Sequence, residues 1–137
     1  MAMRCIDSTF LTLLVRSRPE ALEQASDWAR RGDTQVTTEV NFYEVSLGIE
    51  LERDSRRRSA LRDGFQRLMT SLSILPLTRE ATELAVATQA RLHREGKPAP
   101  FADLFIAAIA ATGGCDLIVT KNLGDFERID LLPVQPH

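Results

Sequence analysis

The chain has 137 residues, with 17 Lys and Arg against 19 Asp and Glu, so its formal charge is −2. This length is typical of one domain, and 44% hydrophobic with 26% charged residues excludes a disordered or fibrous protein. The apolar stretch Phe105–Ala111 is far shorter than the ~18 residues of a membrane span. Cys5 and Cys115 are too few for a disulfide scaffold, so we expect buried thiols in a cytoplasmic protein.

Taken in chain order, short apolar runs alternate with segments of helical periodicity. Helix stop and start signals separate them, such as Pro19 and Gly32 around the second helix. The expected strands are Met3–Ile6, Gln35–Thr38, Ile74–Leu77, Leu117–Thr120 and Leu131–Val134, and the expected helices are Ser8–Arg16, Pro19–Arg31, Glu39–Arg53, Ser55–Ser71, Glu80–Arg94 and Phe101–Thr112. This alternation predicts a single α/β domain over residues 1–137, with a buried parallel sheet.

The helix predicted at Glu39–Arg53 carries apolar residues at spacings of three and four. Val40, Tyr43, Leu47 and Leu51 form this stripe. Such spacing is typical of an amphipathic helix. Leu47 and Leu51, together with Phe42, can either belong to the core or line a groove for a partner helix.

Acidic residues stand where the strands of such a sheet end or where the next helix begins. Asp7 follows the first strand, Glu44 lies on the helix after the second, and Asp103 opens an otherwise apolar helix. Asn122 and Asp125 follow the strand Leu117–Thr120. Because sites in open α/β sheets form beyond the carboxyl ends of the strands, these side chains are candidates for one site.

Each acid also has an ordinary structural role open to it. Asp7 can cap the helix that begins at Ser8, and Asp103 can complement the dipole of its helix. Glu44 can be a solvated helix acid, and Asp125 a turn residue. Gathered at one crevice, however, several carboxylates repel one another and must share protons or hold a cation. Oxygen-only ligands suit Mg²⁺ or Mn²⁺ rather than zinc.

Four motifs give the chain a resemblance to a known family over its whole length. They are Cys5-Ile6-Asp7-Ser8, Glu44-Val45-Ser46-Leu47-Gly48-Ile49, Ala102-Asp103-Leu104-Phe105-Ile106-Ala107-Ala108 and Thr120-Lys121-Asn122-Leu123-Gly124-Asp125-Phe126. With these motifs the chain resembles the PIN-domain ribonucleases, specifically the VapC-type toxins of type II toxin–antitoxin pairs. The last two motifs, in that order, are the more specific ones.

The resemblance implies a PIN-like fold, an α/β/α sandwich with a short central parallel sheet flanked by helices. It implies a Mg²⁺-dependent endoribonuclease, with Mn²⁺ as a possible substitute, that hydrolyses RNA phosphodiester bonds with an activated water. The family's three main acids, which hold the metal, match Asp7, Glu44 and Asp103. The resemblance further implies a cognate antitoxin that neutralises the enzyme, a homodimer, and a toxin–antitoxin hetero-oligomer.

The fourth acid of the family is ambiguous in this sequence. Some members carry Asp at the position of Asn122, whereas many carry Asn there and Asp three residues on, as at Asp125. We therefore count Asp125 among the catalytic acids in a supporting part. Asn122, Ser8 and Thr120 are expected to support the acids through hydrogen bonds.

Three other functions compete with this interpretation. A haloacid-dehalogenase-like phosphotransferase needs a second Asp two residues after Asp7, where Thr9 stands. A receiver domain needs paired acids after the first strand and an Asp after the third, where Pro76, Leu77 and Thr78 follow Leu75. The third is a catalytically silent PIN-like module that acts only by binding a partner.

Overall fold

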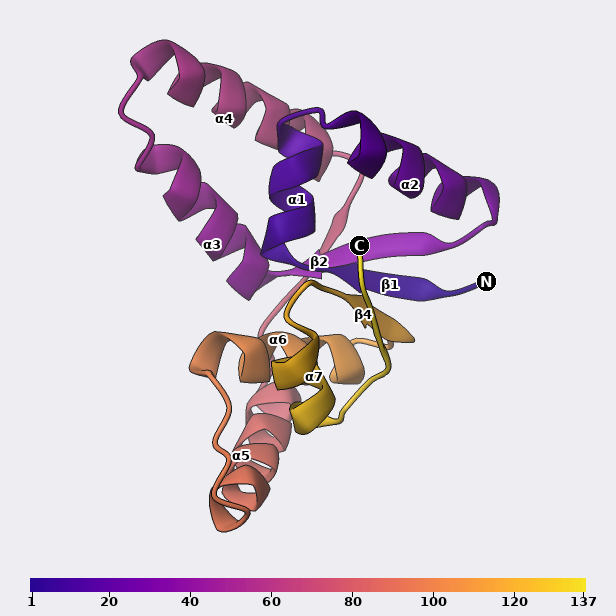
Figure 1. The fold of residues 1–137 in the computed structure, drawn as a ribbon, viewed down its shortest axis with the longest axis vertical. Coiled ribbons are helices and arrows are strands. Elements are labelled where there is room, and N and C mark those ends of the chain that lie inside the picture. The colour runs from indigo at the N-terminus through magenta and orange to yellow at the C-terminus, as the bar shows by residue number, and fades with distance from the viewer.

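A computed structural model describes residues 1–137, and its helices and strands are shown in Figure 1. The strands are β1 (Met3–Ile6), β2 (Thr34–Thr38), β3 (Ser73–Leu75), β4 (Leu117–Val119) and β5 (Val134–Gln135). The helices are α1 (Ser8–Val15), α2 (Pro19–Arg30), α3 (Glu39–Glu50), α4 (Ser55–Met69), α5 (Arg79–Arg94), α6 (Phe101–Thr112) and α7 (Leu123–Ile129).

The predicted α/β fold is confirmed, with local differences at the ends of elements and one additional helix. Strand β3 ends at Leu75, before Pro76, which has no backbone N–H for a sheet ladder. The last strand is Val134–Gln135, three residues later than the expected start at Leu131. Helix α7 was not predicted, because its seven residues offer too short a pattern to recognise.

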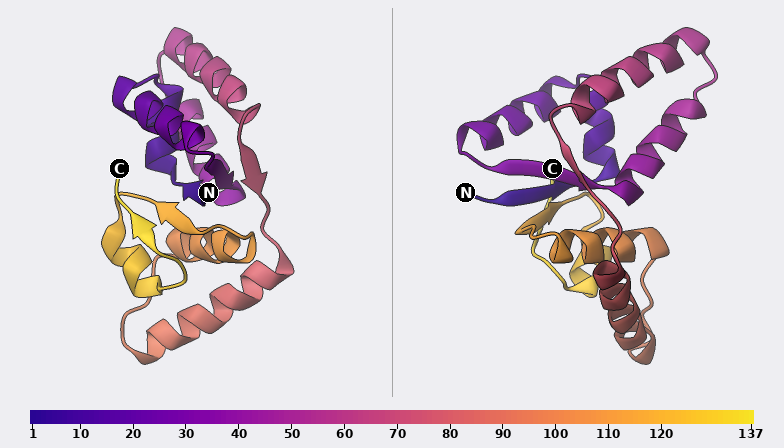
Figure 2. Two further views of the ribbon diagram at one scale, coloured as in Figure 1. Left: turned by 90° about the vertical axis from the view of Figure 1, so that its right-hand side faces the viewer. Right: turned by 180° about the vertical axis from the view of Figure 1, so that it is seen from behind.

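All strand pairs are parallel, in the order β3-β2-β1-β4-β5. Helices α1–α4 lie on one side of this sheet and α5–α7 on the other, as the two further views in Figure 2 show. Side chains of a strand alternate between its faces, so Cys5 and Ile6 enter different cores. The predicted sandwich of two helical layers around a short parallel sheet is therefore confirmed. No helix has the length and apolar character needed to cross a membrane.

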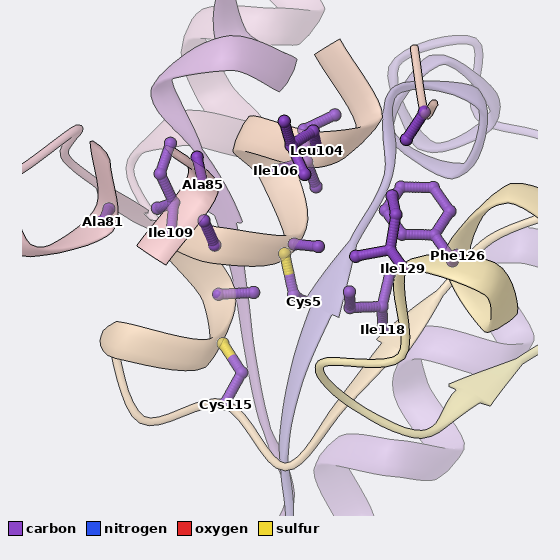
Figure 3. Close-up of a cluster of buried hydrophobic side chains, with 14 of the residues drawn as sticks. Cys5, Ala81, Ala85, Leu104, Ile106, Ile109, Cys115, Ile118, Phe126 and Ile129 are labelled. Carbon is purple, nitrogen blue, oxygen red and sulfur yellow. The ribbon is translucent and has the colours of Figure 1, made fainter. Parts of the chain in front are cut away.

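The core on the α5–α7 side contains both cysteines. Figure 3 shows Cys5 and Cys115 in this cluster, with Ile109 and Ile118 nearby. Both thiols are free and buried, as expected. The pKa of the Cys5 thiol lies well above its ordinary value because of its contact with Cys115 and its burial.

A core position is wrong for three residues of the apolar stripe of α3, whereas Val40 packs against the core. Tyr43, Leu47 and Leu51 are 64%, 43% and 69% exposed, respectively. The buried residues of α3 are instead Val45 and Ile49, together with the polar Asn41. Helices α1 and α4 both pack against α3, and Val45 and Ile49 join Phe10 and Leu11 of α1 in one cluster.

Strand register brings the carboxyl ends of β1, β2 and β4 to one edge of the sheet. Cys5 lies opposite Val36, and Ile6 lies opposite Val119. Asp7, the residue after β1, donates its backbone N–H to the Val119 carbonyl at 3.2 Å. The order of the strands reverses at β1, which has β2 on one side and β4 on the other, so the edge forms a crevice there.

Candidate active site

A cleft of about 210 Å³ lies at this carboxyl edge and contains most of the predicted site residues. The predicted residues in its lining are Asp7, Ser8, Glu44, Asp103, Thr120 and Asn122. Asp125 is outside the lining but bonds to Asn122. The remaining lining residues are Thr9, Asn41, Ile106 and Phe126. Three carboxylates therefore face one cleft whose lining contains no Lys or Arg.

Asp7 combines the two roles that its sequence position suggested. It is the N-cap of α1, where its Oδ1 accepts a hydrogen bond from the Phe10 backbone N–H at 2.9 Å. It also lines the cleft and is nearly buried. The helix cap fixes the carboxylate at the mouth of the crevice, because capping requires a defined side-chain direction.

Glu44 is held by a series of hydrogen bonds that begins at the end of β2. The Thr38 hydroxyl donates to Asn41 Oδ1 at 2.7 Å, and Asn41 Nδ2 donates to Ser8 Oγ at 3.0 Å. Ser8 Oγ then donates to Glu44 Oε1 at 2.6 Å. The hydroxyl of Ser8 thus orients Glu44, in keeping with its expected supporting part.

Asp103 projects from the first turn of α6 and meets Asn122 from the segment after β4. Asn122 Nδ2 donates to Asp103 Oδ2 at 2.6 Å and to Asp125 Oδ2 at 2.8 Å. Thr120 Oγ1 accepts from the Asn122 backbone N–H at 3.0 Å, which holds the amide in place. Burial, followed by the charges of Asp125 and Glu44, raises the pKa of Asp103 from 3.8 to about 6.

Asp125 already has a cationic partner. Arg128 Nη2 lies 2.9 Å from Asp125 Oδ1 and donates to the Pro98 carbonyl at 3.2 Å. An acid that is paired with Arg and lies outside the cleft is a weaker candidate for a metal ligand than Asp7, Glu44 or Asp103. This placement favours the supporting part expected for Asp125.

A model of the PIN domain family matches residues 4–132. The chain belongs to the PIN domain family. Comparison with curated proteins gives no match.

Several solved structures share this PIN fold. VapBC2 from Rickettsia felis, bound to a DNA fragment from its promoter, is 16% identical, with a TM-score of 0.82 over 98% of each chain. DNA-bound VapBC from Salmonella typhimurium is 24% identical, with a TM-score of 0.81 over 99% of this chain and 98% of that one. VapBC-5 from Mycobacterium tuberculosis is 21% identical, with a TM-score of 0.68 over 99% and 98%. At these identities the likeness concerns the fold.

Three residues at or beside the PIN-domain cleft were missed by sequence reasoning. Asn41 lies three residues before Glu44. Its position three residues after the helix-capping Thr38 was the one weak indication in the sequence that its side chain is buried near the site. Arg128 is three residues after Asp125, a helical spacing that becomes readable only once α7 is recognised. His137 lies beside Asp7 and no local pattern points to it.

The donor set fits a hard divalent cation, although the side chains are not arranged around one. No group of three His, Cys, Asp or Glu side chains is set to hold a metal ion. Glu44 is turned to Ser8, and Asp103 to Asn122. The oxygen donors and the raised pKa of Asp103 suit Mg²⁺ or Mn²⁺, because such an ion would relieve the repulsion between the carboxylates.

Proposed function

We propose that this single PIN domain is a metal-dependent endoribonuclease that hydrolyses phosphodiester bonds in RNA. The cleft that carries Asp7, Glu44 and Asp103 without a basic side chain is the observation that carries the proposal. We propose these three acids as the catalytic ligands of Mg²⁺, with Mn²⁺ as a substitute. The ion, when bound, supplies the positive charge that offsets the negative charge developing on a phosphodiester oxygen.

In this proposal the surrounding side chains keep the acids in place. Ser8 orients Glu44, while Asn122 orients Asp103 and stays anchored through Thr120. Asp125 holds the other side of the Asn122 amide and is itself kept in place by Arg128. Partners of this kind determine the direction of a ligand and strengthen binding of the ion.

Cleavage of total cellular RNA by the purified chain tests this function. We expect discrete fragments with Mg²⁺ or Mn²⁺, none with EDTA, and none with Asp103→Asn. Asp63→Asn, on the exposed face of α4, is the matched control and is expected to cleave like the original protein. Cleavage in EDTA would contradict the metal, and full activity of Asp103→Asn would contradict the site. Absence of cleavage by folded, metal-loaded protein would favour the silent binding module.

We further propose that the chain is the toxin of a VapC-type toxin–antitoxin pair, acting as a homodimer that its antitoxin binds. The VapBC structures named above support this partner. So does the exposed apolar stripe Tyr43, Leu47 and Leu51, which runs along α3 next to a groove of about 120 Å³ between α1, α3 and α4. Val15, Val45, Ile49 and Leu61 form the apolar part of the groove lining, and Arg16, Glu44 and Glu52 add charged groups. A groove with this mixed lining suits an amphipathic helix of a partner.

Co-expression with a candidate antitoxin protein tests the partner. We expect that protein to suppress growth arrest by the original chain but not by Leu47→Glu, because a buried unpaired charge opposes docking. Leu22→Glu on α2 is a matched control, since Leu22 is exposed to a similar degree, 46%. Equal suppression of both variants would place the antitoxin elsewhere.

A further inference from the structure

The end of the chain places an imidazole beside Asp7, next to the cleft but outside its lining. Strand β5 pairs with β4 through Val119 and Gln135, and the Thr120 backbone N–H donates to the Gln135 carbonyl at 2.9 Å. The segment therefore runs past the carboxyl edge of the sheet, toward α1 (Figure 1). There the His137 ring stacks on Phe10, with 5.0 Å between the centroids and 23° between the planes.

The buried nitrogen of this ring faces one carboxylate oxygen. The His137 side chain is 4% exposed, and its Nε2 lies 3.4 Å from Asp7 Oδ1. Nε2 is buried and has no aligned hydrogen-bond partner. A lone pair on Nε2 would repel the carboxylate, so the neutral ring is expected to carry its proton on Nε2. A buried N–H that makes no hydrogen bond destabilises the folded state, so a hydrogen bond from Nε2 to the nearby Asp7 Oδ1 is favoured.

The same carboxylate oxygen also accepts from the backbone. Phe10 N–H donates to Asp7 Oδ1 at 2.9 Å, whereas no protein group bonds to Asp7 Oδ2. The two contacts gather at Oδ1 and leave Oδ2 as the oxygen available to a ligand. Phe10 supplies both the backbone donor and the ring on which His137 rests.

We propose that His137 is a positioning residue for Asp7. By donating from Nε2 to Oδ1, it fixes the rotation of the carboxylate so that Oδ2 faces the cation in the cleft. The inference rests on the metal site of the proposed function and adds to it a residue that is far from every motif in the sequence. Neighbours that orient a metal ligand typically change ion affinity by about 10- to 100-fold when they are removed.

Mn²⁺ binding to the purified full chain, measured by electron paramagnetic resonance, tests this role. His137→Phe keeps a ring for Phe10 but removes the donor, and we expect its Kd for Mn²⁺ to rise by about 10-fold or more. His137→Gln keeps a donor and is expected to bind within a few-fold of the original protein. His93→Phe is the control, because His93 is the other histidine and lies exposed on α5. Circular dichroism establishes that each variant is folded.

The outcomes separate this inference from the proposed function. Mn²⁺ binding by folded His137→Phe within about twofold of the original protein would overturn the positioning role. Equal weakening in His137→Phe and His137→Gln would also overturn it, since shape rather than the donor would then matter. If the original chain binds Mn²⁺ but cleaves no RNA, the nuclease proposal fails while the Kd values still decide the role of His137. If it binds no Mn²⁺, the metal site and the inference fail together.

Discussion

Replacing Asp103 by Asn is expected to stabilise the metal-free protein at neutral pH. Burial and the neighbouring acids raise the pKa of Asp103 from 3.8 to about 6, so its charged form is disfavoured in the folded state. This rise of about two pH units corresponds to roughly 3 kcal/mol, at about 1.4 kcal/mol per unit. Asp103 is only half-buried and solvent screens its charge. We therefore expect Asp103→Asn to raise the free energy of unfolding by about 1–2 kcal/mol.

The sign of the effect sets its pH dependence. Above about pH 6 Asp103 is charged in the folded state and destabilises it, whereas below about pH 4 it is neutral in both states. The stabilisation by Asp103→Asn is therefore expected to be largest at about pH 8. It decreases as the pH drops from about 6 to about 4 and is absent at lower pH. Added Mn²⁺ is expected to reverse the order at about pH 8, because the ion stabilises the original protein more than the variant.

Urea unfolding in EDTA at about pH 8 and about pH 4 measures this difference, with Asp63→Asn as the control. Asp63 is exposed on α4 and makes no salt bridge, so its replacement is expected to change the free energy of unfolding by less than about 0.5 kcal/mol. The reasoning is refuted if Asp103→Asn is no more stable than the original protein at about pH 8. It is equally refuted if the gain is the same at both pH values.

Two further predictions concern α3. Asn41→Leu removes a fully buried side chain that accepts from Thr38 and donates to Ser8, and it is expected to lower the free energy of unfolding by about 1–3 kcal/mol, measured in urea. A change below about 0.5 kcal/mol would show that these hydroxyls find other partners. Gly48→Ala adds a Cβ with no atom within 4 Å in the middle of the helix, so we expect a stabilisation of about 1 kcal/mol in thermal unfolding. Because Gly48 lines the groove beside α3, the same variant is expected to bind the antitoxin more weakly; unchanged affinity would argue against occupation of the groove.

The order of most elements and the acids at the strand ends could be predicted from the sequence. These features depend on local chemistry: the period of apolar residues, the helix start and stop signals, and polar residues after apolar runs. Asp7, Glu44 and Asp103 could be predicted as site residues because the carboxyl ends of parallel strands lie at one edge of the sheet. Their meeting in one cleft, lined also by Ser8, Thr120 and Asn122, is a consequence of that topology.

The buried face of α3 and the additional residues that contact the acids could not be predicted, because they depend on packing between distant elements. The stripe Tyr43, Leu47 and Leu51 satisfies helical periodicity, yet α1 and α4 cover the side that carries Val45 and Ile49. His137 Nε2 lies 3.4 Å from Asp7 Oδ1 because β5 pairs with β4 and brings the end of the chain back toward α1. No local sequence pattern connects two residues so far apart in the chain. Both cases have one cause. Local helix propensity is the same whichever face of a helix is buried, and packing against elements distant in sequence determines the face and the contacts.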